Sequence, residues 1–164
     1  MRTTFLTGLI AAAFLGTVSS ASAQSASASV SAEVQQPITV TKTRDLDFGL
    51  VFAGVNKVIA VTSATSASFS ITGQSSTQVH ITFTLPATLT SGGNALTLST
   101  WTARHNTTNS AATGTDFTPS SSPTTATLSA AGGLFVFLGA TAEPTTTQAA
   151  GTYTGTATMT VVYF

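Results

Sequence analysis

The sequence predicts an all-β protein, an antiparallel β-sandwich of about seven to nine short strands that follows a cleaved signal peptide. Apolar and polar residues alternate with a period of two along most of the chain, as in strands that bury one face. Gly, Ser and Pro separate these alternating stretches, as turn residues do. Helix-forming Glu, Lys, Arg and Gln are scarce while Thr and Val abound, which also favours strands over helices.

The first 23 residues have the three parts of a secretory signal peptide. Arg2 supplies a positive charge, residues 5–15 are mostly apolar, and Ala21-Ser22-Ala23 is an A-x-A cleavage site. This apolar run is too short to span a bilayer, and no later stretch reaches that length. We therefore expect Sec-dependent export to the periplasm, cell surface or extracellular space, with no transmembrane segment in the mature chain, residues 24–164.

The mature chain is long enough to bury a core as one domain, and its lack of Cys means that no disulfide contributes. Residues 104–123 and 139–150 are expected to be connections, and the last strand is expected to be the longest. The expected strands are residues 26–34, 38–48, 58–61, 68–72, 78–85, 96–99, 126–128, 134–138 and 152–163.

An outer-membrane β-barrel is the main alternative, because apolar and polar residues also alternate along its strands and because the chain ends at Phe164. Such barrels need strands of about nine to eleven residues and girdles of aromatic side chains. Most alternating stretches here are shorter, and the chain has one Trp and two Tyr. The pattern therefore favours the sandwich.

The chain is almost without charge. Charged residues make up 6% of it and the net charge is zero, whereas Ser and Thr together number 55 of 164 residues. A typical soluble domain has about 25% charged residues. There is no basic surplus for phosphate contacts, so nucleic acid is not an expected partner. Few charges are left to prevent strand edges from pairing with other chains, and this favours assembly.

No catalytic, cofactor or metal site is predicted. His80 lies on the polar face of an expected strand and His105 in an expected loop, and neither has a partner at metal-ligand spacing. Asp45 and Asp47 could share one strand face, but Lys42 and Arg44 lie close by, so a solvated charge cluster is the preferred interpretation. No G-x-S-x-G nucleophile motif occurs. We therefore expect no enzymatic activity.

The first mature stretch is a candidate donor strand for strand addition, in which an extended segment of one subunit completes the sheet of another. It alternates small apolar residues with Ser and Glu, and Gln35-Gln36-Pro37 separates it from the next stretch. We treat residues 24–36 as this segment and residues 37–164 as the sandwich domain. Pairing of the stretch within its own domain remains the alternative. The candidate donor residues are Ala26, Ala28, Val30, Ala32 and Val34.

A second hypothesis is a monomeric secreted module that binds a glycan or another surface ligand. Its contacts would come from the expected loop at residues 101–109. The candidate ligand residues are Trp101, Arg104, His105 and Asn106.

Three parts of the sequence resemble a secreted bacterial family, the domain of unknown function numbered 4402. These parts are Ile38-Thr39-Val40 with Leu46-Asp47-Phe48-Gly49, residues 69–74 (FSITGQ), and residues 150–155 (AGTYTG) with Val161-Val162-Tyr163. The opening and closing parts are also similar to those of spore coat protein U and chaperone–usher pilin subunits. The resemblance implies an immunoglobulin-like, pilin-like sandwich that self-associates or joins pilin-like subunits with help from a periplasmic chaperone.

Together these observations predict a non-enzymatic structural protein, a pilin-like subunit of a surface fibre or coat, with residues 25–34 as the donor strand.

Overall fold

The computed structural model describes residues 24–164, so the predicted signal peptide lies outside the described residues. The chain divides into two units, residues 1–33 and residues 34–164. In the first unit, residues 24–33 belong to no helix or strand and are exposed. The stretch 26–34, which alternation predicts as a strand, therefore forms no strand in the structure.

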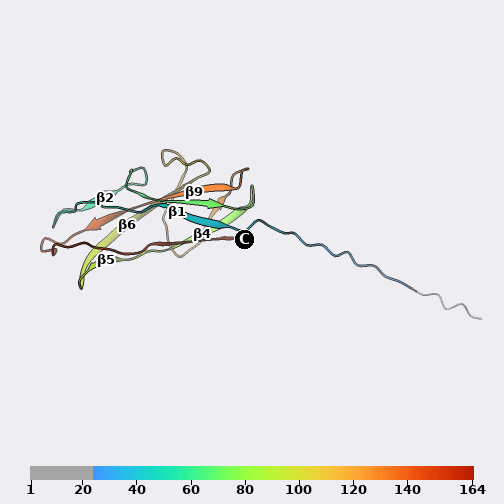
Figure 1. The fold of residues 1–164 in the computed structure, drawn as a ribbon, viewed down its shortest axis with the longest axis horizontal. Coiled ribbons are helices and arrows are strands. Elements are labelled where there is room, and N and C mark those ends of the chain that lie inside the picture. Colours follow the sequence, from blue (N-terminus) through green and yellow to red (C-terminus); the bar gives the residue numbers. More distant parts are fainter. Residues whose placement is uncertain (1–23) are drawn as a thin grey trace, which may run out of the picture. The chain divides into compact units, whose positions relative to one another are not determined.

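Residues 34–164 form an all-β domain, with ten strands and no helix in this part of the chain (Figure 1). The strands are β1 (Thr39–Arg44), β2 (Lys57–Ile59), β3 (Ala67–Thr72), β4 (Gln78–Thr84), β5 (Thr88–Ser91), β6 (Asn94–Asn106), β7 (Thr115–Phe117), β8 (Thr124–Thr127), β9 (Gly133–Glu143) and β10 (Thr158–Tyr163).

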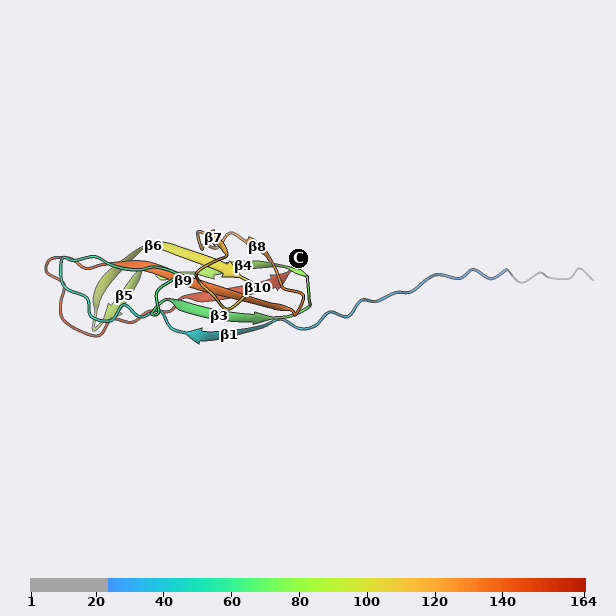
Figure 2. The ribbon, with the colours of Figure 1, turned by 90° about the horizontal axis from the view of Figure 1, so that it is seen from above.

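The strands form two antiparallel sheets (Figure 2). The large sheet has the order β1-β3-β9-β6-β5, with β2 paired to β9 and β7 paired to β6. The small sheet has the order β10-β4-β8, so β10 is an edge strand. The predicted antiparallel all-β sandwich is confirmed, and the additional strands are short ones such as β5 and β7.

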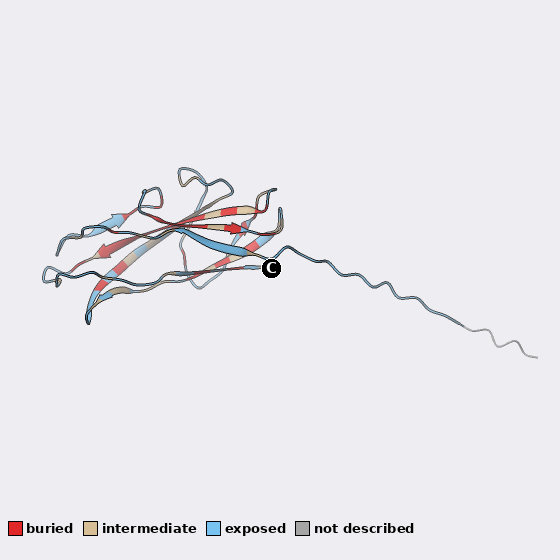
Figure 3. Cartoon of the chain, in the orientation of Figure 1, coloured by how far each residue is buried: buried red, intermediate tan, exposed pale blue. Residues whose placement is uncertain are grey.

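The main core lies between the two sheets. In β4, Val79, Ile81 and Phe83 point inward and are almost fully buried, while the residues between them are more exposed. The Phe83 ring meets that of Phe69 on β3 edge to face, with centroids 6.3 Å apart. Such alternation produces the buried bands along the strands in Figure 3. Each large apolar side chain buried in this way contributes about 1.5–3 kcal/mol.

Several strand limits differ from the sequence prediction. Strand β9 continues to Glu143 instead of ending at residue 138, because it lies between β6 on one side and β3 and β2 on the other. Strand β6, not the last strand, is the longest. Residues 45–48 and 152–157 alternate in sequence but lie outside the assigned strands.

Candidate functional site

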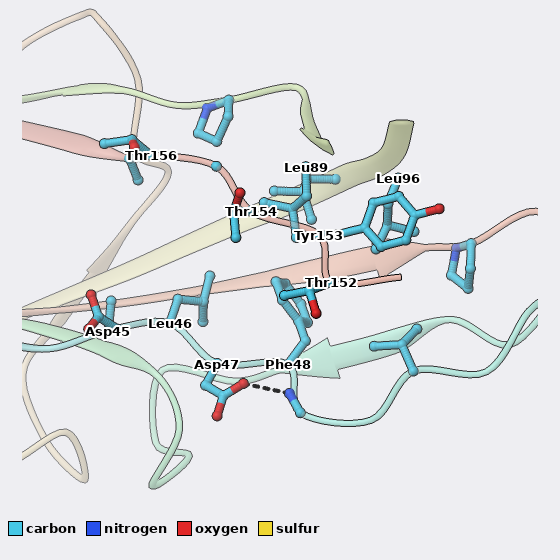
Figure 4. Close-up of a pocket in the computed structure, with 18 of the residues that line it drawn as sticks. Asp45, Leu46, Asp47, Phe48, Leu89, Leu96, Thr152, Tyr153, Thr154 and Thr156 are labelled. Atoms are coloured by element: carbon cyan, nitrogen blue, oxygen red, sulfur yellow. Dashed lines mark hydrogen bonds between the residues drawn. The ribbon is translucent and has the colours of Figure 1, made fainter. Parts of the chain in front are cut away.

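The two alternating segments that lie outside the strands border an open groove of about 860 Å³. Residues 45–53, after β1, form one side, and residues 148–157, before β10, form the other. Figure 4 shows Leu46 and Phe48 of the first segment on one side of residues 152–156, and Leu89 of β5 and Leu96 of β6 on the other.

Local turn chemistry ends β1 and shapes the first side of the groove. The Asp47 Oδ1 atom accepts a hydrogen bond from the backbone N–H of Gly49 at 2.7 Å, which closes an Asx turn. Gly49 has φ of 60°, a left-handed conformation that glycine adopts readily. The Asp47 N–H donates to the Thr65 carbonyl oxygen at 3.0 Å, so the segment is tied to the loop before β3.

Gln148 and Tyr153 hold the second side in place. The Gln148 amide donates to the Ala95 carbonyl oxygen at 3.0 Å and to the Tyr153 hydroxyl at 2.7 Å. That hydroxyl in turn donates to the Ala149 carbonyl oxygen at 2.7 Å. These bonds fix the start of the segment against β6.

The backbone of residues 149–157 pairs with the rest of the domain at one point. Thr154 and Thr90 exchange N–H···O bonds of 2.9 and 3.0 Å, and these are the backbone-to-backbone bonds found for this segment in the described structure. Backbone groups otherwise pair wherever they can. The segment therefore offers donors and acceptors for an added strand.

The floor of the groove is apolar. Leu46 and Phe48 point toward the facing segment in Figure 4, whereas Asp47 points away from it. Phe48 is 9% exposed and belongs to a second core cluster with Leu96 and Leu98. The groove is thus an open extension of the core.

Trp101 contributes to the same floor. The pairing of β6 with β9 shifts register between Ser99 and Thr102, and Thr100 has φ of 47°, which is unusual for a β-branched residue. This bulge lets Trp101 pack against both core clusters while it lines the groove.

The four predicted charged residues, Lys42, Arg44, Asp45 and Asp47, all border the groove. Lys42 and Asp45 form an exposed ion pair at 2.6 Å. Arg44 donates from Nε to the Ser66 carbonyl oxygen at 2.5 Å and from Nη2 to the Ser66 hydroxyl at 3.0 Å. Asp47 serves the turn described above. Lys42, Asp45 and Asp47 are exposed, as expected of a solvated charge cluster, whereas Arg44 is half-buried and bonded to the buried Ser66.

The candidate donor residues are free of strand pairing. Val30 and Val34 are 96% and 92% exposed, and Ala26, Ala28 and Ala32 are also exposed. A single exposed apolar residue is common on protein surfaces. Here five exposed apolar residues occupy alternate positions of one segment, and none of them pairs with a strand in the described structure. Sequence reasoning identified these residues.

The candidate ligand residues lie in strand β6 rather than in a loop. Arg104 forms a two-pronged contact with Asp116 of β7, at 2.5 and 2.8 Å, and this raises the pKa of Arg104 and lowers that of Asp116. The Asn106 amide nitrogen donates to the carbonyl oxygens of Ser110 and Thr113, both at 3.0 Å. Both side chains therefore hold the loop that joins β6 to β7.

The two histidines are half-buried. Burial lowers the pKa of His105, whose ring lies 5.8 Å from that of Phe117. His80 stacks on the ring of Phe164, with centroids 3.8 Å apart. His80 was expected to face solvent, and the last residue of the chain covers part of it instead. Within residues 24–164, no three His, Asp or Glu side chains gather as a metal site.

Sequence reasoning missed the groove itself, since alternation predicted strands through both of its sides. Gly49, Gly54, Gly151 and Gly155 flank or interrupt these segments and were the available signal. Glycine inside an alternating stretch often marks a bulge or a close backbone approach.

In the described residues, no helix has the length and apolar character needed to cross a membrane.

Comparison with known proteins gives a family but no characterised relative. No curated protein and no solved structure matches the chain. A family model matches residues 38–163, which include every strand and both sides of the groove. The chain therefore belongs to the family described as Domain of unknown function (DUF4402).

Proposed function

We propose that this protein is an exported, non-enzymatic structural subunit that assembles by strand addition. In this proposal, the N-terminal arm, residues 25–34, of one copy occupies the groove of the next. The observation that carries it is the open apolar groove beside residues 149–157, a segment with few backbone partners, in a chain that also has an unpaired alternating arm.

The arm suits the groove in its chemistry. In an extended strand, its even-numbered residues share one face and its odd-numbered residues the other. The even face carries only Ala and Val, which suit the floor formed by Leu46, Phe48 and Trp101. The odd face carries Ser and Glu33 and would remain in solvent. Burial of Val30 and Val34 would each contribute about 1.5–3 kcal/mol.

The edge of the small sheet suits the same assembly. Strand β10 is an edge strand, and residues 144–164 contain no charged side chain. Soluble proteins usually protect such an edge with Lys, Pro, a bulge or a covering segment. Residues 25–34 of a second copy would cover it by adding main-chain hydrogen bonds.

The resemblance to spore coat protein U and chaperone–usher pilins supports the same function, since those are exported immunoglobulin-like subunits. It also suggests a periplasmic chaperone as a partner, because an open apolar groove needs cover before assembly. In this proposal the protein is located in the periplasm or at the cell surface.

A pair of adjacent substitutions tests the proposal. Val30→Asp places a charge on the face that enters the groove, whereas Ser29→Asp places the same charge on the outward face. We expect Val30→Asp, and deletion of residues 24–35, to leave monomers in analytical ultracentrifugation, while Ser29→Asp assembles like the wild type. Unchanged assembly of the deletion variant would refute the proposal.

Binding of a glycan or other ligand by a monomer is the second candidate, because Trp101 lines the groove. In that case the deletion variant would bind the ligand as well as the intact mature chain does. Replacement of Trp101 by Ala would then abolish binding while the domain stayed folded by circular dichroism.

A further inference from the structure

A second cleft, of about 420 Å³, shares no lining residue with the groove. Its lining comes from the end of β6, the start of β7 and strand β8, and we call it the β8 cleft. Figure 2 shows β7 and β8 near each other in the domain. Strands β8 and β10 are opposite edges of the small sheet, so the cleft lies away from the segment before β10. Ligand sites commonly have volumes of about 300–1,000 Å³, and the β8 cleft falls in this range.

His105 lines the β8 cleft from the space between the two sheets. It lies opposite Val136 of β9, which is fully buried in the core, so both side chains are on the inner face of the large sheet. His105 is near the end of β6 and is half-buried. Its ring forms no hydrogen bond within residues 24–164, and no buried side-chain nitrogen is left without a partner in that part of the chain. Both ring nitrogens can therefore be reached from the cleft.

The protonation state of His105 decides which groups it can bind. Burial lowers the pKa of His105, so the ring is neutral at neutral pH. In a neutral imidazole, one nitrogen donates a hydrogen bond and the other accepts one. A hydroxyl group also donates and accepts, so it can bond to either nitrogen. His105 is therefore suited to a ligand that bears hydroxyl groups.

The other polar groups of the β8 cleft are also neutral donors and acceptors. Four of its lining residues bear a hydroxyl: Thr107, Thr115, Thr125 and Thr127. Strand β8 pairs with β4 and is an edge of the small sheet, so backbone N–H and C=O groups are free along its other side. A cleft with many neutral hydrogen-bonding groups fits a ligand that carries many of its own.

No charged side chain lines the β8 cleft. The charged residues of β6 and β7 are Arg104 and Asp116, which are next in sequence to His105 and Thr115 and so lie on the other face of the sheet. There they pair with each other at 2.5 and 2.8 Å. A charged ligand in the cleft would lose water and gain no counter-ion, which is costly. The cleft therefore favours an uncharged ligand.

We propose that the β8 cleft binds a neutral sugar unit of a glycan, with His105 as its central hydrogen-bonding residue. A neutral sugar ring carries several hydroxyl groups and no charge, and it therefore complements the donors and acceptors of the cleft. The inference goes beyond the proposed function and does not depend on it. Because the cleft and the groove share no lining residue, a subunit whose groove is filled by an arm still has its β8 cleft open.

Saturation-transfer NMR tests the class of ligand, because it detects weak binding to monomers and to assemblies. The probes are D-glucose, D-galactose and N-acetyl-D-glucosamine at millimolar concentration, each added to the mature chain. We expect transfer to at least one of these neutral sugars and none to D-glucuronate, which has the glucose ring with an added carboxylate. Absence of transfer to all three neutral sugars, or equal transfer to glucuronate, would overturn the proposal.

Substitutions in the cleft test the site. His105→Phe keeps a ring beside Phe117 but removes both nitrogens, and we expect it to abolish the transfer. Thr125→Val removes a hydroxyl and should weaken binding by about fivefold, as the loss of one hydrogen bond does. Thr125→Ser keeps the hydroxyl and should bind like the wild type. Circular dichroism checks that each variant folds. Wild-type binding by His105→Phe, or by Thr125→Val if His105→Phe does not fold, would overturn the inference.

Two further variants separate this inference from the functions proposed above. Deletion of residues 24–35 removes the arm and should leave sugar binding intact. If the deletion variant assembles like the wild type, strand addition is refuted and the sugar site is unaffected. If Trp101→Ala abolishes sugar binding while His105→Phe retains it, the sugar lies in the groove and the inference is wrong.

Discussion

His105 carries a pH dependence that belongs to a single residue. Burial lowers its pKa from the ordinary value of 6.5, so the folded state favours the neutral ring. As pH falls through 6.5, the unfolded chain takes up the proton first, and stability is lost until the folded-state pKa is reached. We expect His105→Gln to reduce the loss of stability between pH 7.5 and 5.5, measured by urea unfolding. Equal losses in both proteins would contradict this.

Gly139 is a second residue whose role is local. A Cβ at this position in β9 would meet the carbonyl oxygen of Ile59 in β2, a backbone atom that cannot move aside. We expect Gly139→Ala to lower the free energy of unfolding by about 1–3 kcal/mol, as overpacking does. Gly133→Ala is the control in the same strand, because its Cβ would lie an ordinary 3.6 Å from the Ser129 hydroxyl. Equal stability of the two variants would refute the argument.

At the scale of the element, the β6 bulge provides a spectroscopic test. It aims the one Trp of the chain at the groove floor, where an arriving arm would exclude water. We expect Trp101 emission to shift to shorter wavelength as the mature chain is concentrated and assembles. Val30→Asp should show no shift over the same range. Identical spectra from both proteins would argue that the groove stays open to water.

Alternation of apolar and polar residues predicted the strands well where one face of the strand is buried and the other is exposed to solvent. Strands β4 and β10 lie within their predicted ranges, and β3 begins one residue before its own, because Ile81, Val161 and Ile71 each lie in a clear period of two. Strand limits depend on the neighbours, which a period does not reveal. Residues 140–142 are buried because β9 is central, and residues 152–157 alternate just as well but meet a partner strand only at Thr154.

A sequence period does not reveal the neighbours of a segment, and this also explains how much of the site could be predicted. The arm residues were identifiable because their alternation is local, and Trp101 was named as the start of an expected loop. The groove was not predictable, since it is bordered by residues 45–53 and 148–157, two segments distant in sequence that do not pair as strands. Patterns in one segment report which face is apolar, but only the fold shows whether that face is covered.

At the scale of the whole molecule, the scarcity of charge predicts how assembly responds to salt. The proposed contacts are main-chain hydrogen bonds and apolar burial, and Glu33 is the one charged side chain of residues 25–34. One exposed ion pair formed by Glu33 would be worth up to about 1 kcal/mol, so raising NaCl from about 50 to 500 mM should shift half-assembly by less than about fivefold. Ammonium sulfate should strengthen assembly, because excluded salts favour apolar burial. Sedimentation at matched protein concentration measures both effects. Dissociation of the assembly by NaCl alone would contradict this prediction. It would show that ion pairs hold the subunits together, although only 6% of the residues are charged.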